Sequence, residues 1–405
     1  MRRKFLQAVL IQALAPLLLL GLSVLISRLL GPADQGAFAF AKSWFDLLVV
    51  IGCFGFPQSF VIAINRDGTS RKILYKATLI YAVCLLPIFF IASLVFGGKL
   101  TNTGFLALAI SMGAACVVLV NLWRGILLTI DDGLRFQAIT MLPTIFLVAV
   151  VSVCTYAGFS LLTDMPYFYT AIGSFALVAA YFIIPWGSVK DLQGSSPNAG
   201  KLIKNGVEVF VQALAMSLQG FICLSWLKHG ANLAEVGYFS VALVLINACI
   251  FPLQAVAPMV LNVWSKGSEG QALQSGKAAI LKATLFLTML SVAIAALIPY
   301  LAPIVLGQKF VNAVPAMQVA VLGLVPAFLY RMDSLRLSAA SHFQFNSIVA
   351  AIRCLIFIAF IFGSLMIPNV SITALTAATC WVLAEISAAS LAKLRVNYLK
   401  KININ

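Results

Sequence analysis

Three charged residues lie inside or at the edge of long apolar segments near the start of the chain: Arg28, Lys42 and Asp46. Lys42 and Asp46 are four residues apart, so a helix places them on one face, where they can pair. A charge at the centre of a membrane costs roughly 2.5–3.5 kcal/mol and usually faces protein or water. The two cations suit a phosphate-bearing substrate, and the carboxylate suits a coupling cation. Two plainer interpretations stay open: a pair that only neutralises itself, and an Arg28 that anchors its helix at the interface.

Other polar side chains fall within predicted helices further along the chain. Glu208, Gln212 and Gln219 follow one face of a helix and are candidates for the wall of a lumen. In this interpretation the two glutamines contact substrate and Glu208 binds a coupling cation, although an interfacial carboxylate explains Glu208 equally well. Arg353 and Glu385 are candidates for substrate and cation contact, and the alternative is that they pair with each other.

These residues belong to a chain that is too apolar for a soluble protein. It has 405 residues, of which 62% are hydrophobic and 10% charged, and its mean hydropathy is +1.03. A soluble domain carries about 25% charged residues. Apolar runs longer than about 18 residues, without strict alternation, predict an all-α polytopic membrane protein rather than a β-barrel. Twelve transmembrane helices are predicted, over residues 7–29, 37–63, 74–96, 104–127, 137–158, 166–186, 206–227, 236–263, 279–303, 312–330, 346–367 and 371–393.

The distribution of basic residues predicts the orientation. If the N-terminus is cytoplasmic, the cytoplasmic segments hold 21 of the 27 Lys and Arg residues and the outer segments hold four. Positive charge marks cytoplasmic loops, so we expect an N-in/C-in topology. The same bias explains the net charge of +15 without nucleic acid as a partner. No cofactor or metal is expected, because the eight cysteines lie in apolar segments without a CxxC pair and the two histidines are far apart.

Short matches between distant segments predict an internal repeat. The segment around Arg124 resembles the segment around Arg331, and the segment that begins at Gly36 resembles the one that begins at Gly237. These matches occur in the same order in the two halves of the chain. An even number of helices in each half makes the repeats parallel, related by an axis along the membrane normal. We therefore predict a six-helix bundle over residues 1–187, a cytoplasmic linker over 188–205, and a second six-helix bundle with a short cytoplasmic tail over 206–405. Two such bundles are the architecture of an alternating-access transporter.

The segment S-R-x-L-G-P-x-x-x-G at residues 27–36, directly after a first membrane helix, resembles the multidrug/oligosaccharidyl-lipid/polysaccharide (MOP) superfamily. Within it, the whole chain is similar to the polysaccharide-transport branch, the Wzx-type O-antigen flippases. The resemblance implies movement of an undecaprenyl-diphosphate-linked oligosaccharide from the cytoplasmic to the periplasmic leaflet of the bacterial inner membrane, through a cationic cavity. It also implies membrane lipids, a polysaccharide polymerase and a chain-length regulator as partners.

The driving force is the remaining question for a transporter. The nucleotide-binding motif GxxxxGK[ST] is absent from the sequence, so ATP is not the direct driver. Moving one negative charge out of an inside-negative cell gains ~2.3 kcal/mol per 100 mV, and antiport of H⁺ or Na⁺ is the natural supplement. Asp46, Glu208 and Glu385 are the candidate cation-coupling residues.

Three alternatives to a flippase are compatible with a membrane protein of this kind. A MATE-like multidrug antiporter should have an acidic lumen, whereas the predicted helices of this chain also carry cations. A membrane enzyme of glycan assembly should carry a large outer loop, whereas all predicted outer loops are short. A scaffold that transports nothing stays open.

Overall fold

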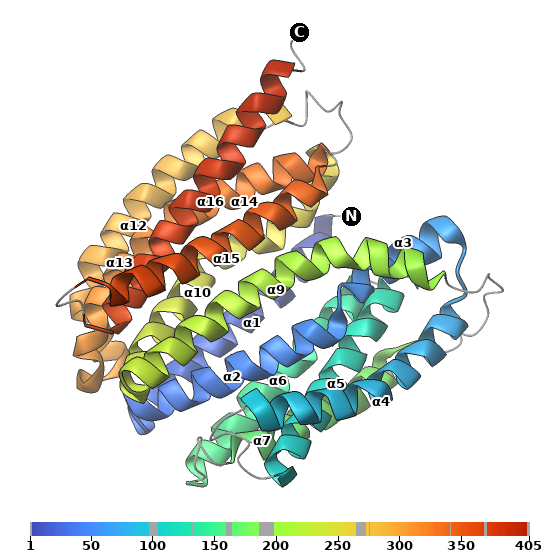
Figure 1. Cartoon of the computed structure of the whole chain (residues 1–405), viewed down its shortest axis with the longest axis horizontal. Helices are drawn as coiled ribbons and strands as arrows, with labels where there is room; N and C mark the ends of the chain where they lie inside the picture. Colours follow the sequence, from blue (N-terminus) through green and yellow to red (C-terminus); the bar gives the residue numbers. More distant parts are fainter. Residues whose placement is uncertain are drawn as a thin grey trace. The chain divides into compact units, whose positions relative to one another are not determined.

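The computed structural model describes residues 2–96, 104–130, 133–158, 164–185, 198–264, 273–274, 276–340, 342–367 and 371–402. All secondary-structure elements of these residues are helices (Figure 1), which confirms the all-α prediction. The α-helices are α1 (Arg2–Leu29), α2 (Pro32–Cys53), α3 (Phe56–Asp67), α4 (Arg71–Phe96), α5 (Gly104–Leu127), α6 (Gly133–Tyr156), α7 (Met165–Ile183), α9 (Ala199–Gly230), α10 (Leu233–Trp264), α12 (Lys277–Leu306), α13 (Val314–Leu322), α14 (Leu324–Ala339), α15 (Phe343–Leu365) and α16 (Ala374–Ile402). Two 3₁₀ segments, η2 (Leu128–Ile130) and η3 (Gln308–Ala313), follow α5 and α12.

The helices have the length and composition of membrane spans. Ten helical segments of the described residues are long and apolar enough to cross a bilayer. Two shorter apolar stretches, Leu17–Leu29 and Tyr167–Ile183, belong to α1 and α7. Each of the twelve predicted segments coincides with one helix or with consecutive helices. The protein is therefore a multi-pass membrane protein, while the count of twelve crossings and the N-in/C-in orientation stay predictions.

Two of the predicted helices are interrupted. The segment over residues 37–63 ends as α2 and restarts as α3, with Gly55 at a φ of 69° between them. Glycine adopts this left-handed conformation without steric cost, and Pro57 has no amide hydrogen with which to continue the helical hydrogen bonds. The segment over 312–330 is likewise divided into η3, α13 and α14, and Pro326 lies in the first turn after the second break. Periodicity alone does not reveal such breaks, because both sides of each break are apolar.

Internal contacts group the chain into two compact units. One unit comprises Met1–Leu22 and Ala41–Ser217, and the other comprises Ser23–Phe40 and Leu218–Asn405. The divisions fall inside α1, α2 and α9, so each of these helices contributes residues to both units. The bundles over residues 1–187 and 206–405 stay a prediction, and much of the predicted linker lies outside the described residues.

In the first unit, α5 is the central helix and packs against α3, α4, α6 and α7. Its apolar side chains are buried along most of its length, and Trp123 donates a hydrogen bond from its indole nitrogen to Thr78 Oγ1 at 3.2 Å. Small residues let α7 approach closely: a Cβ added at Gly113 would lie only 2.3 Å from the carbonyl oxygen of Tyr169. This close approach fixes the position of Tyr169, which matters for the site described below.

In the second unit, α16 packs against α10, α13, α14 and α15. Its buried face carries six alanines, Ala374, Ala377, Ala378, Ala384, Ala388 and Ala392, and these small side chains allow dense packing of neighbouring helices. Four described helices of this unit therefore pack against a helix whose core-facing side is small and apolar.

The two glycines of the predicted repeat meet each other in the second unit. A Cβ at Gly36 of α2 would lie 1.9 Å from the Leu233 carbonyl oxygen, and a Cβ at Gly237 of α10 would lie 2.0 Å from the Pro32 carbonyl oxygen. The contact is reciprocal, because each glycine meets the residue four positions before the other. Two repeated halves related by a two-fold axis would produce such a self-complementary contact, and the internal repeat itself stays a prediction.

Candidate functional site

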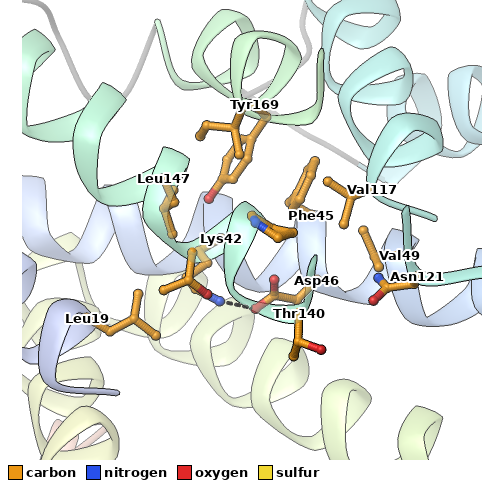
Figure 2. Close-up of a pocket in the computed structure, with 13 residues that line it drawn as sticks. Leu19, Lys42, Phe45, Asp46, Val49, Val117, Asn121, Thr140, Leu147 and Tyr169 are labelled. Atoms are coloured by element: carbon orange, nitrogen blue, oxygen red, sulfur yellow. Dashed lines mark hydrogen bonds and ion pairs between the residues drawn. The ribbon is translucent and has the colours of Figure 1, made fainter. Parts of the chain in front are cut away.

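A cavity of about 210 Å³ lies within the first unit, and Lys42 and Asp46 are on its wall (Figure 2). Side chains from five helices enclose it: Leu19 of α1; Lys42, Phe45, Asp46 and Val49 of α2; Val117 and Asn121 of α5; Thr140, Pro143, Thr144 and Leu147 of α6; and Tyr169 and Ile172 of α7. The two residues that their spacing placed on one helix face thus share one cavity. A space of this size holds an ion or a phosphate-sized group, since sites for larger ligands occupy about 300–1,000 Å³.

Lys42 and Asp46 form an ion pair across one turn of α2, between Lys42 Nζ and Asp46 Oδ2. The pair remains accessible, because the side chains are 28% and 48% exposed, respectively. An accessible pair of this kind contributes only about 0–1 kcal/mol to stability. Another anion can therefore displace Asp46 from Lys42, and another cation can displace Lys42 from Asp46, at a small energetic cost.

Tyr169 is a member of the cavity wall that the sequence analysis missed. Its ring stacks on Phe45 with 4.1 Å between ring centroids. The residue is only 1% exposed, and its hydroxyl has no hydrogen-bond partner among the described residues. Figure 2 shows this hydroxyl directed toward the Lys42–Asp46 pair. An unpaired buried hydroxyl costs about 1–3 kcal/mol, so this group is available to a ligand.

The sequence held a weak signal for these additional residues. Tyr169 lies in an aromatic run, and Asn121 and Thr144 are isolated polar residues in strongly apolar helices. Which helix faces meet is a tertiary property, so this signal does not select them over the other polar residues of the chain.

Arg353 and Glu385 form a buried ion pair in the second unit. Arg353 Nη1 donates to Glu385 Oε1 at 2.9 Å, and the two side chains are only 6% and 4% exposed. The Arg353 guanidinium also lies 5.6 Å from the ring centroid of Tyr330. This is the structural alternative that the sequence left open, and it places both residues in contacts that join α15 to α16. Their roles in substrate or cation binding stay predictions.

Arg28 contacts the end of another helix in the second unit. Its Nε donates to the Val305 carbonyl oxygen at 2.7 Å, and its Nη2 donates to the Ile304 carbonyl oxygen. Both carbonyls belong to the last turn of α12, where no further helical turn supplies amide donors. A cation at a helix C-terminus is also favoured by the helix dipole. Arg28 therefore has a structural contact, and its predicted contact with phosphate stays a prediction.

The three candidates on α9 differ in burial. Glu208 and Gln212 belong to the first unit, are partly buried and are not part of the cavity wall. Gln219 belongs to the second unit and is 3% exposed. Neither atom of its side-chain amide has a hydrogen-bond partner among the described residues. The helix places these residues on one face as predicted, but the cavity brings together only Lys42 and Asp46 among the predicted site residues.

The chemistry of the cavity is that of a polar binding site. It offers a cation, a carboxylate, three hydroxyl groups and an amide, set in an apolar wall. The described residues contain no group of three or more His, Cys, Asp or Glu side chains that could hold a metal ion. Lysine recognises phosphate as a point charge, and hydroxyl and amide groups bond to sugars.

Several known proteins are similar to this chain. Its residues 1–264 match the family described as polysaccharide biosynthesis protein. No curated protein sequence matches the chain. A multidrug resistance MATE family transporter of the MOP superfamily, in an inward-facing conformation, is similar in structure, with 18% identity, a TM-score of 0.76, and coverage of 97% of this chain and 99% of that chain.

Two further structures extend this similarity. The outward-facing conformation of a MATE family transporter matches with 19% identity and a TM-score of 0.66, over 97% of this chain and 94% of that one. A MOP superfamily transporter from Pyrococcus furiosus Vc1, described as having a binding pocket of reverse polarity that suggests a different function, matches with 18% identity and a TM-score of 0.62, over 97% of this chain and 96% of that one.

The family match covers well over half of the chain, and the structural matches extend over nearly all of it. At these identities the structural matches establish the fold, which is that of MOP superfamily transporters. The resemblance detected in the S-R-x-L-G-P-x-x-x-G segment is thus confirmed at the level of the superfamily and of its polysaccharide branch. The chain belongs to the polysaccharide biosynthesis protein family and has a transporter fold.

Proposed function

We propose that the protein is a flippase that moves an undecaprenyl-diphosphate-linked oligosaccharide from the cytoplasmic to the periplasmic leaflet of a bacterial inner membrane. The observation that carries the proposal is a lysine in an accessible cavity of a polysaccharide-family chain with a transporter fold. A lipid-linked diphosphate needs a cation on its route, because an unpaired phosphate charge is costly in a low-dielectric environment. Lys42 supplies that cation within the membrane-spanning part of the chain.

The Lys42–Asp46 pair gives the proposal a mechanism. When the diphosphate enters, its oxygens compete with Asp46 for Lys42, and the accessible pair separates at a small cost. Asp46 then loses its counter-charge and gains affinity for H⁺ or Na⁺. Binding of the anionic substrate and of the coupling cation is thereby linked through one pair of side chains. The Tyr169 hydroxyl, which points into the same space, donates to the substrate headgroup.

Among the three candidate coupling carboxylates, Asp46 is favoured by its surroundings. It is 48% exposed on a cavity, whereas the Glu385 carboxylate is buried against Arg353. Releasing Glu385 would leave a buried cation unpaired, which costs about 3–5 kcal/mol. Glu208 is partly buried on α9, away from the cavity wall. We therefore assign the coupling role to Asp46.

A multidrug antiporter of organic cations is the competing function, because the similar MATE transporters have this fold. Fold similarity does not fix the charge of the substrate, and the transporter from Pyrococcus furiosus Vc1 is itself described as having a pocket of reverse polarity. A cavity for an organic cation should not present a lysine, since like charges repel. The charge of Lys42 therefore favours the anionic substrate.

The test is the amount of lipid-linked oligosaccharide in cells that lack the gene, with rescue by the wild-type chain and by Lys42→Ala, Lys42→Arg and Asp46→Asn. Lys204→Ala is the matched control, because Lys204 is exposed on α9 and lies outside the cavity wall. We expect intermediates to accumulate in the cytoplasmic leaflet without the gene, and the control to clear them. Lys42→Ala should fail, and Lys42→Arg should restore part of the transport.

The outcomes separate the candidate functions, provided that each variant is present at the wild-type level. If Lys42→Ala clears the intermediates as well as the control, flipping stands and Lys42 has no role in it. If no intermediate accumulates and dye export changes instead, the protein is a multidrug exporter. A polysaccharide polymerase and a chain-length regulator are the partners that this function would require downstream.

A further inference from the structure

Four basic residues converge at one end of the second unit. The ends of α14 and α16 pack together through Leu337, Ala340, Val396 and Leu399, and Leu273, four residues before Lys277 of α12, belongs to the same core cluster. Arg336 and Lys400 are the sequence neighbours of Leu337 and Leu399, and Lys393 precedes Val396 by three residues. At this place Lys400 interacts electrostatically with Lys277, Arg336 and Lys393, and Asp333 is the acidic residue among these neighbours. We call Lys277, Arg336, Lys393 and Lys400 the terminal basic cluster. The helices that carry it are held together by the packing of α14 against both α12 and α16. The cluster is thus a built feature of three helices rather than a run of charges in one loop.

Among the described residues, one member of the cluster forms a direct ion pair. Arg336 is buried, and its Nη1 donates to Asp333 Oδ1 at 2.9 Å. In the part of the chain that the structure describes, Lys277, Lys393 and Lys400 form no direct ion pair. Among the described residues, these three positive charges therefore have no direct carboxylate partner, and they repel one another.

The first turn of α12 adds to this positive potential. Lys277 is the first residue of that helix, directly after the Gly276 cap. The amide groups of a first turn have no carbonyl partners within their own helix and attract anions.

Exposed apolar side chains also lie on the helices that carry the cluster. On α12, Leu281 and Leu285 continue the face of Lys277 at intervals of four residues and are 62% and 60% exposed. On α16, Leu394 and Tyr398 are 65% and 56% exposed. Exposed leucines next to lysines suit acyl chains next to headgroups, and tyrosine is enriched at membrane interfaces.

Helix length places the cluster at headgroup depth. The 29 residues of α16 span about 43 Å at ~1.5 Å per residue, which exceeds a ~30 Å hydrocarbon core by about nine residues. The charged end from Lys393 to Lys400 is the part that extends beyond the core. It belongs to the side that the excess of basic residues predicts to be cytoplasmic.

We propose that the terminal basic cluster binds the phosphate headgroup of an anionic phospholipid of the cytoplasmic leaflet, with its acyl chains along α12 and α16. Lys277, Lys393 and Lys400 contact the phosphate oxygens, and the exposed leucines contact the chains. The site lies in the second unit and does not involve the cavity around Lys42, so it stands or falls separately from the flippase proposal. Basic surfaces on the cytoplasmic side of membrane helices attract anionic lipids with about 1 kcal/mol per lysine or arginine.

The experiment measures lipid retention by the purified full chain. Wild type and the variant Lys277→Gln/Lys393→Gln/Lys400→Gln are incubated with phosphatidylglycerol or phosphatidylcholine, and bound lipid is counted by native mass spectrometry. The control is Lys72→Gln/Lys76→Gln/Lys204→Gln, which removes three exposed lysines of the first unit and changes the net charge equally. Undecaprenyl diphosphate is a third ligand, because it carries phosphate on a different lipid.

We expect selective retention of phosphatidylglycerol by wild type and by the control. Removing each lysine of the cluster should weaken binding about five-fold, and the triple variant should lose about 100-fold. The variant Lys277→Arg/Lys393→Arg/Lys400→Arg should keep the affinity, since it keeps the charges. Equal loss in the cluster variant and the control would overturn the proposal, as would retention of undecaprenyl diphosphate in place of phosphatidylglycerol.

Discussion

Replacing Glu385 with glutamine should destabilise the protein far more than breaking the exposed ion pair between Lys201 and Asp67. The Arg353–Glu385 pair is 2.9 Å long, and its side chains are only 6% and 4% exposed. Glutamine keeps the shape of the side chain but leaves the Arg353 charge buried without a counter-ion. Breaking a buried pair in this way costs about 3–5 kcal/mol, which is a change of at least a hundred-fold in the folding equilibrium.

The matched control is Asp67→Asn, which breaks the pair between Lys201 and Asp67 in the first unit. That pair is 3.4 Å long, and its side chains are 62% and 33% exposed. Exposed pairs contribute about 0–1 kcal/mol, so this variant should unfold almost like wild type. A third variant, Arg353→Met/Glu385→Leu, replaces the buried pair with apolar groups and should recover most of the lost stability.

The assay is unfolding of the purified protein in mild detergent, followed by circular dichroism as a denaturing detergent is added. We expect wild type and Asp67→Asn to unfold at the same midpoint concentration of denaturant. The double variant should unfold close to that midpoint, and Glu385→Gln should unfold at a much lower concentration. If Glu385→Gln unfolds with the control, the pair does not hold α15 to α16. If Glu385→Gln instead keeps wild-type stability and loses transport, Glu385 is a coupling residue and the assignment of that role to Asp46 is wrong.

Three further variants test single contacts. Gly36→Ala should prevent stable folding, because its Cβ would lie 1.9 Å from a backbone oxygen, whereas Gly220→Ala meets nothing within 4 Å and should fold normally in an expression assay. Tyr169→Phe removes a buried hydroxyl that has no partner among the described residues, so transport should fall while the unfolding midpoint holds or rises. Unchanged transport would exclude that hydroxyl from the substrate path. Arg28→Gln should speed hydrogen exchange in the last turn of α12, where Arg28 bonds to two carbonyl groups, and unaltered exchange there would refute the capping role.

Much of the fold was predictable, because length and hydropathy identify membrane-spanning helices in a sequence. A bilayer offers no water to backbone groups, so each crossing has to be a continuous run of apolar residues. The breaks at Gly55 and near Pro326 were not predicted, since a membrane protein tolerates proline and glycine in some helices and breaks at others. Whether a helix continues or breaks at such a residue depends on whether neighbouring groups donate hydrogen bonds to the carbonyl groups that lose their helical partners. The contacts between helices decide this, and the sequence alone does not show them.

The candidate site was predictable only where the relevant contacts are local. Lys42 and Asp46 are one turn apart, so their shared face follows from helix geometry alone. The addition of Asn121, Thr144 and Tyr169 required the packing of α5, α6 and α7 around α2. Local spacing finds the charged pair, and tertiary packing provides the rest of the wall.

Burial then assigns different roles to two pairs that look alike in the sequence. The Arg353–Glu385 pair joins two helices, excludes solvent and is expensive to break, so it suits a fixed part of the structure. The Lys42–Asp46 pair lies on one helix, opens on a cavity and is cheap to break, so it suits ligands that come and go. A transporter has to release what it binds, and a charge held too tightly by its partner or by its substrate would stop the cycle. The weakness of the Lys42–Asp46 pair is therefore an argument for its function.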